Sequence, residues 1–143
     1  MKAAAFLKKN FLFVIAAILI LAGVTVLAFW NMPKTFLKSV DVADVAYIAV
    51  FNGSTGHGFR VESSADIAEI VTNLQGIEAR KEKSAANIDG FLFRLSFYGR
   101  DGECIDTLIV NRQGISDDFF VYTIEKGTPC TDKLLTLEKD LMQ

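Results

Sequence analysis

The sequence predicts an α+β protein, in which an N-terminal transmembrane helix precedes a small antiparallel sheet of five to six strands with two helices packed on one face. Three observations predict this fold. An uncharged apolar run opens the chain, several strands follow one another as a meander, and two segments have apolar residues at helical spacing. Because strands and helices do not alternate regularly, a parallel sheet built from strand–helix repeats is not expected.

The apolar run Phe11–Trp30 is predicted to form a membrane-spanning helix. At about 1.5 Å per residue, a helix of this length matches the roughly 30 Å hydrocarbon core of a bilayer. Lys2, Lys8 and Lys9 precede the run and no acidic residue does. The positive-inside rule therefore predicts a cytoplasmic N-terminus and an extracytoplasmic C-terminal part.

The same pattern leaves two fates open for this segment, because a basic start before an apolar stretch also describes a cleavable secretory signal. The length of the run favours an uncleaved anchor, since signal cores have about 7–15 residues. The alternative is a protein secreted after cleavage. The anchored form divides into a cytoplasmic basic tail (1–10), a transmembrane signal anchor (11–30), a spacer (31–44) and an extracytoplasmic α+β domain (45–143).

The charge distribution argues against a nucleic-acid partner. The whole chain has 15 basic and 17 acidic residues, and three of its lysines precede the apolar run. The part that follows the run is therefore mildly acidic. Nucleic-acid binding needs clustered positive charge to displace counterions from phosphates, and no such cluster is present in the sequence.

The first half of the domain is predicted to contain a hairpin, a helix and a further strand. Val45–Phe51 is rich in β-branched and aromatic residues and ends at an Asn-Gly turn, with Phe59–Glu62 as its partner strand. Ser63 and Ser64 are candidate N-caps of a helix that ends near Gly76 and has one apolar face, made of Ile67, Ile70, Val71 and Leu74. Ile77–Ser84 carries many charges and is predicted to be an exposed edge strand.

The second half is predicted to form a three-stranded meander and a closing helix. The strands are Phe91–Tyr98, Cys104–Val110 and Phe119–Ile124. The first alternates large apolar residues with a mixed set that includes Arg94, Ser96 and Tyr98. Thr131 is a candidate cap of the last helix, which has Leu134, Leu137 and Leu141 on one face.

One glycine-rich loop is a candidate contact site. It consists of Asn52, Gly53, Ser54, Thr55, Gly56 and His57. A phosphate-binding loop would lead into a helix, whereas this loop leads into a strand and lacks the ending of a P-loop. The loop is therefore interpreted as a hairpin turn, whose exposed tip is available to touch a partner.

No cofactor, metal or catalytic site is predicted. The single histidine and two widely separated cysteines have no zinc spacing, and no nucleophile is placed beside a base. Cys104 and Cys130 would both lie on the oxidising side of the membrane, so they are either bridged or two separate thiols. Their sequence separation does not decide between these alternatives.

The anchor, the Asn-Gly hairpin, the helix beginning Ser-Ser-Ala-Asp-Ile-Ala-Glu-Ile and the meander together resemble small uncharacterised exported domains of Gram-positive bacteria. The resemblance is one of pattern, extends over Val45–Met142 and implies no functional residue. We expect a membrane-anchored extracytoplasmic binding or accessory module without catalytic activity, which contacts the bilayer through its apolar helix and acts through a protein or cell-envelope partner. The alternatives are a small envelope hydrolase with carboxylate chemistry and a ligand sensor that relays through a membrane partner.

Overall fold

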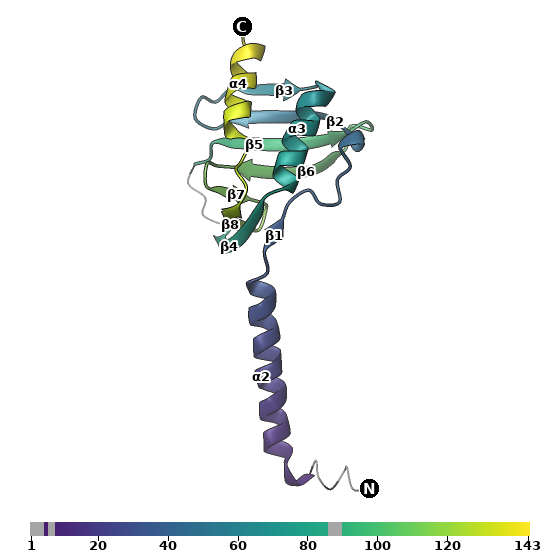
Figure 1. Cartoon of the computed structure of the whole chain (residues 1–143), viewed down its shortest axis with the longest axis vertical. Helices are drawn as coiled ribbons and strands as arrows, with labels where there is room; N and C mark the ends of the chain where they lie inside the picture. The colour runs from purple at the N-terminus through teal and green to yellow at the C-terminus, as the bar shows by residue number, and fades with distance from the viewer. Residues whose placement is uncertain (1–4, 6–7, 86–89) are drawn as a thin grey trace. The chain divides into compact units, whose positions relative to one another are not determined.

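The structure is a computed structural model that describes residue 5 and residues 8–85 and 90–143 (Figure 1). It consists of two units, Met1–Met32 and Pro33–Gln143, each of which is described by itself. Lys2, which contributes to the predicted basic tail, lies outside the described residues, whereas Lys8 and Lys9 lie within them.

Helix α2 (Phe11–Trp30) is the main element of the first unit, and its bounds are those predicted for the apolar run. The helix is long and apolar enough to cross a membrane, a property that signal sequences share. The hydroxyl of Thr25 donates a hydrogen bond to the carbonyl oxygen of Leu21 at 2.7 Å. This polar group is therefore satisfied within the helix itself, as an apolar environment requires.

The second unit contains an antiparallel sheet, which confirms the predicted α+β class. Its eight described strands have the order β1-β4-β8-β7-β6-β5-β2-β3. Their bounds are β1 (Lys34–Thr35), β2 (Val45–Asn52), β3 (Gly58–Val61), β4 (Glu78–Ser84), β5 (Phe93–Gly99), β6 (Cys104–Val110), β7 (Gly114–Ser116) and β8 (Phe120–Lys126). A short 3-10 helix, η1 (Val42–Asp44), precedes β2.

The predicted count of five to six strands is too low, because two short strands were not recognised in the sequence. β1 has two residues and β7 has three, so neither is long enough to show an alternating pattern. β1 lies in the segment predicted to be a spacer, where Phe36 and Leu37 are also buried. Most of the predicted spacer is therefore part of the folded domain.

Strand β4 is not the exposed edge that its charges suggested. It pairs with β8 over most of its length and with β1 at its start, so it is second from the edge. Ala79, which faces the core, is fully buried. The lysines of β4 are tolerated because its neighbour β1 is short and covers only the first part of the strand.

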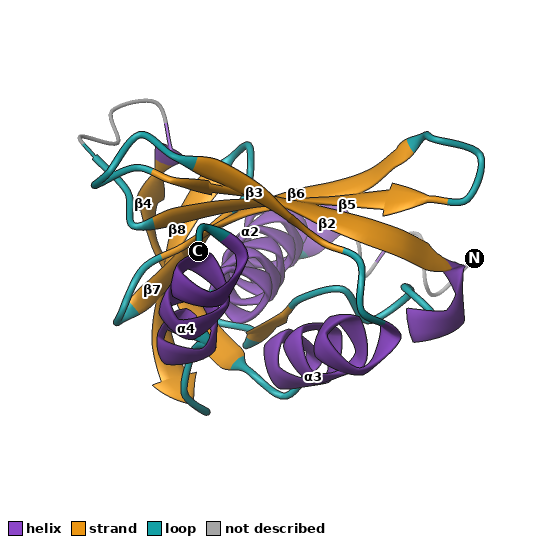
Figure 2. Ribbon diagram, turned by 90° about the horizontal axis from the view of Figure 1, so that it is seen from above, coloured by secondary structure: helices purple, strands orange, loops and turns teal. Residues whose placement is uncertain are grey.

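Two helices pack on the same face of the sheet, as predicted (Figure 2). Helix α3 (Ser64–Gln75) is capped by the Ser63 hydroxyl, which accepts a hydrogen bond from the backbone N–H of Asp66. Helix α4 (Thr131–Leu141) buries Leu134, and Thr131 is its first residue and not its cap, since Cys130 occupies the N-cap position without a side-chain hydrogen bond. The apolar side chains under the helices come mainly from β2, β5 and β6, and they include Ile48, Val50, Phe93, Leu95, Phe97 and Leu108.

Candidate functional site

Within the described part of the domain, no helix packs on the face of the sheet opposite α3 and α4 (Figure 2). Figure 2 shows both helices on one side of β2, β5 and β6, with no helix of the domain on the other side of these strands. Alternate residues of each strand point to this second side, which we call the open face. It includes Tyr47, Ala49 and Phe51 of β2, Arg94, Ser96 and Tyr98 of β5, Arg60 of β3 and Thr107 of β6.

A groove of about 470 Å³ lies on the open face. Its floor is made of two small residues, Ala49 and Ser96, which are directly opposite each other in the pairing of β2 with β5. Phe51 and Arg94 form the next pair along these strands, and they stand beside the floor. Small residues between larger ones therefore produce the concave surface.

Two arginines border the groove, and each lies over an aromatic ring. The guanidinium carbon of Arg60 is 4.2 Å from the ring centroid of Tyr47, and that of Arg94 is 4.7 Å from the ring centroid of Phe91. The Tyr47 ring is stacked on Tyr98, with centroids 4.8 Å apart and an angle of 12° between the rings. The rings attract the cations and hold them in place, while the N–H groups remain able to donate hydrogen bonds.

The charge at the groove is only weakly neutralised by the described part of the protein. Arg60 is 3.7 Å from a carboxylate oxygen of Glu62, and both side chains are more than half exposed, so this pair contributes little. Within residues 8–85 and 90–143, the structure shows no ion pair for Arg94. None of the described residues that line the groove is acidic. The groove therefore favours anionic groups.

The predicted contact loop connects β2 and β3, and its first residue differs from the others in burial. Gly53, Ser54, Thr55, Gly56 and His57 are exposed, whereas Asn52 is buried. Gly56 has a φ of 74°, which favours glycine and is typical of a tight turn. The exposed part of the loop is available to a partner, but it carries no arrangement of groups that points to a ligand.

Asn52 fixes the loop to helix α4. Its side-chain amide donates a hydrogen bond of 2.7 Å to one carboxylate oxygen of Glu138, and the hydroxyl of Thr55 donates one of 3.1 Å to the other oxygen. The amide oxygen of Asn52 accepts hydrogen bonds from the backbone N–H groups of Ser54 and Thr55. These contacts have a structural role, because they satisfy two buried polar side chains.

The two cysteines are free thiols in the structure. Cys104 is exposed at the start of β6, while Cys130 is buried at the start of α4. Burial, together with the negative charge of Glu69, raises the pKa of Cys130 to about 11. The structure thus has two separate thiols, of which only that of Cys104 is exposed.

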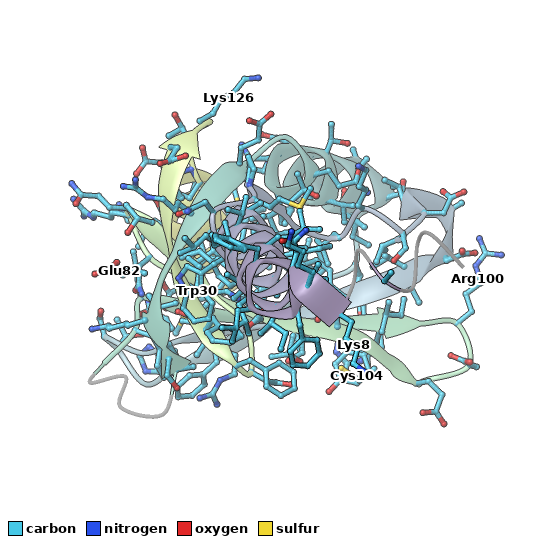
Figure 3. The ribbon with its side chains drawn as sticks, turned by 90° about the horizontal axis from the view of Figure 1, so that it is seen from below. Lys8, Trp30, Glu82, Arg100, Cys104 and Lys126 are labelled. Atoms are coloured by element: carbon cyan, nitrogen blue, oxygen red, sulfur yellow. The ribbon has the colours of Figure 1, made fainter. Side chains whose placement is uncertain are left out.

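Cys104 lies close to the floor of the groove. Its sulfur is 3.6 Å from the hydroxyl oxygen of Thr107, which in turn donates a hydrogen bond of 3.2 Å to the hydroxyl of Ser96. Figure 3 shows Cys104 and Arg100, which belong to the same end of the sheet, and Glu82 far from both. The exposed thiol of Cys104 therefore lies beside the open face, where a thiol reagent can label it.

Three aspartates, Asp106, Asp117 and Asp118, line a smaller hollow of about 260 Å³ near β1. They are the candidates for the carboxylate chemistry of a hydrolase. Asp117 already accepts hydrogen bonds from the backbone N–H groups of Phe119 and Phe120 and from the hydroxyl of Tyr122. Burial raises the pKa of Asp106, and the charges of Asp117 and Asp118 add to this effect. The Asp117 carboxylate therefore serves the β7–β8 turn.

A hollow of about 550 Å³ lies between residues 39–44 and the β5–β6 turn. Two of its three carboxylates serve turns, since Asp41 accepts a hydrogen bond from the N–H of Ala43 and Asp101 accepts one from the N–H of Glu103. Among the residues that the structure describes, no group of three or more His, Cys, Asp or Glu could hold a metal ion. The groove on the open face is therefore the best candidate site.

The residues of this site were missed as a group by sequence reasoning, although part of the signal was visible. Arg94, Ser96 and Tyr98 alternate with the apolar residues of the best predicted strand, so their shared face could be recognised. Arg60 and Ala49 could not be placed beside them without the strand order. No family model matches this chain, and no curated protein or solved structure is significantly similar to it.

Proposed function

We propose that this protein is a membrane-anchored extracytoplasmic binding or accessory module, without catalytic activity, that holds a membrane or envelope protein on its open face. The groove between Arg60 and Arg94 is the observation that supports this function. Tyrosine and arginine are enriched at protein interfaces, where they bury large contact areas and make charge-assisted hydrogen bonds. An uncovered sheet face with both residue types is typical of a protein-binding surface.

The proposed location follows from helix α2 and the lysines that precede it. The helix has the length and apolar character of a single membrane crossing. The basic residues on its N-terminal side favour a cytoplasmic N-terminus and hence a domain outside the cytoplasm. Retention of the helix gives an anchored protein, and cleavage by signal peptidase gives a secreted one.

The exposed thiol of Cys104 provides a test of this orientation. A membrane-impermeant maleimide is added to intact cells that express the full chain, and labelling is compared with that after lysis. We expect labelling of Cys104 in intact cells and none in a Cys104→Ser variant, because Cys130 is buried. Labelling only after lysis would contradict the proposed orientation. Fractionation of the labelled protein into membrane and medium then separates an anchor from a cleaved signal.

Site-specific photo-crosslinking tests the proposed binding surface. A photoreactive amino acid replaces Ala49 on the groove floor, and a matched variant carries it at Arg112, an exposed residue in the β6–β7 turn. We expect the Ala49 variant, but not the Arg112 variant, to form one dominant adduct with another membrane or envelope protein. Equal adduct patterns at both positions, or adducts at neither, would contradict binding through the open face.

A further inference from the structure

We propose that the groove binds an extended acidic segment of its partner protein, whose carboxylates pair with Arg60 and Arg94. This inference rests on the proposed function and specifies the chemistry of the partner. Arginine donates two parallel hydrogen bonds to a carboxylate, a geometry that lysine cannot reproduce. The partner is thus defined by negative charge at more than one position along an extended chain.

The distribution of charge is the first argument. The chain as a whole has a formal net charge of −2, and its acidic residues outnumber its basic ones. Yet the described residues that line the groove include two arginines and no carboxylate. A positive groove on an acidic protein attracts acidic segments, while the remaining surface repels them.

The spacing of the arginines is the second argument, and it favours a chain over a small anion. Arg60 is opposite Ala49 in β2, whereas Arg94 is opposite Phe51, so the two lie on either side of β2 and two residues apart along it. Neighbouring strands are about 4.8 Å apart and residues rise about 3.4 Å each, which separates the two Cα atoms by roughly 12 Å. One carboxylate or one phosphate does not readily engage both arginines, whereas an extended peptide with several acidic residues does.

The way into the groove is the third argument. β3 is the last strand of the sheet in the order given above, so no described strand pairs with its outer side. Gly58 of β3 lies opposite Phe51, and a Cβ atom at Gly58 would be 3.6 Å from the Val50 carbonyl oxygen and 3.8 Å from the Phe51 ring. These are ordinary contacts, so a side chain would fit here, and its absence keeps the lining of the groove low on the side of the sheet edge. An extended segment can enter across this position.

Peptide binding to the full chain in nanodiscs of neutral lipid tests the inference. The probes are two fluorescent octapeptides, one alternating Glu with Thr and the other alternating Gln with Thr, and fluorescence anisotropy measures their binding. We expect the Glu peptide to bind and salt to weaken its affinity, while the Gln peptide does not bind. Arg60→Gln and Arg94→Gln should each lower the affinity about tenfold or more, since each removes charge-assisted hydrogen bonds.

Two further variants serve as controls. Arg100→Gln removes the same charge at the tip of the β5–β6 turn, outside the groove, and should leave the affinity unchanged (Figure 3). Gly58→Val retains both arginines but places a side chain at the edge of the groove. This variant should abolish binding of the Glu peptide. Its backbone φ is not in the left-handed region, so the fold should tolerate the change.

Several outcomes would overturn the inference. Equal binding of the Glu and Gln peptides, an effect of Arg100→Gln as large as that of Arg94→Gln, or no binding of the Glu peptide would each do so. Vesicles of phosphatidylglycerol test an anionic lipid surface as the alternative ligand. If the protein binds these vesicles through its two arginines and does not bind the Glu peptide, the inference is also overturned. If the peptide fails while the Ala49 crosslink persists, the acidic chemistry is wrong but the binding function stands.

Discussion

Replacing Glu138 with alanine tests how the turn between β2 and β3 is fixed to helix α4. Glu138 and Asn52 are 8% and 1% exposed, and they are joined by a 2.7 Å hydrogen bond between segments 86 residues apart in the sequence. In the alanine variant, the amide of Asn52 loses its partner but remains buried. Such an unsatisfied group reduces the free energy of unfolding by about 1–3 kcal/mol.

Two smaller effects modify this value. Thr55 is exposed, so water can replace its lost hydrogen bond to Glu138. Alanine is a better helix former than glutamate, and removal of a negative charge near a helix C-terminus gains a few tenths of a kcal/mol. We therefore expect a net loss of about 2 kcal/mol, which lowers the folding equilibrium constant roughly 30-fold. Glu138→Gln should lose less than about 1 kcal/mol, because glutamine can still accept the hydrogen bond from Asn52.

The buried thiol of Cys130 provides the assay. The only tryptophan, Trp30, belongs to α2 and not to the domain whose unfolding is to be measured. In a Cys104→Ser background, reaction of Cys130 with a thiol reagent is measured against urea concentration for the full chain in neutral detergent. Asp140→Ala, which removes an exposed carboxylate from the same helix, is the matched control. If Glu138→Ala unfolds at the same urea concentration as Asp140→Ala, the reasoning is refuted.

Three further predictions concern the same domain. Gly127 has a φ of 91°, so Gly127→Ala should lower the free energy of unfolding by about 1–2 kcal/mol in the same assay. Lys133 of α4 is 2.7 Å from Asp66 and 2.9 Å from Glu69 of α3, so the wild-type protein should lose stability in high salt and Lys133→Met should lose this salt dependence. Burial raises the pKa of Cys130 from 9.0 to about 11, so only the unfolded state ionises between these values. Stability should therefore fall as the pH rises from about 9 to 11, and circular dichroism of Cys130→Ala should show a smaller decrease.

The longer elements of the fold were predictable because their signals are local. The apolar run, the capped helix after Ser63 and the Phe-rich strand each have a periodicity that depends only on neighbouring residues. β1 was not predictable, because its two residues pair with Glu78 and Ala79, more than 40 residues away. The burial of Phe36 in the same segment also depends on tertiary contacts, as shown by its edge-to-face packing on Tyr122.

The candidate site was less predictable, because it depends on the order of strands in the sheet. Arg94 and Ser96 share a face within one strand, which alternation reveals. Arg60 and Ala49 join them only because β2 pairs with β5, although strand β3, helix α3 and strand β4 lie between these two strands in the sequence. No local pattern specifies that pairing. The loop residue Asn52 illustrates the same limit, since its partner Glu138 lies in the last helix.

The contact between Asn52 and Glu138 and the groove use the two faces of one strand, so they should be coupled. Asn52 of β2 points toward the helices, while its neighbour Phe51 borders the groove and is paired with Gly58. Because Glu138 fixes the turn that carries β3, its loss should displace the edge of the groove even in molecules that remain folded. We therefore expect Glu138→Ala to weaken binding of the Glu peptide in the absence of urea, whereas Asp140→Ala should not. Unchanged affinity would show that strand pairing alone maintains the groove.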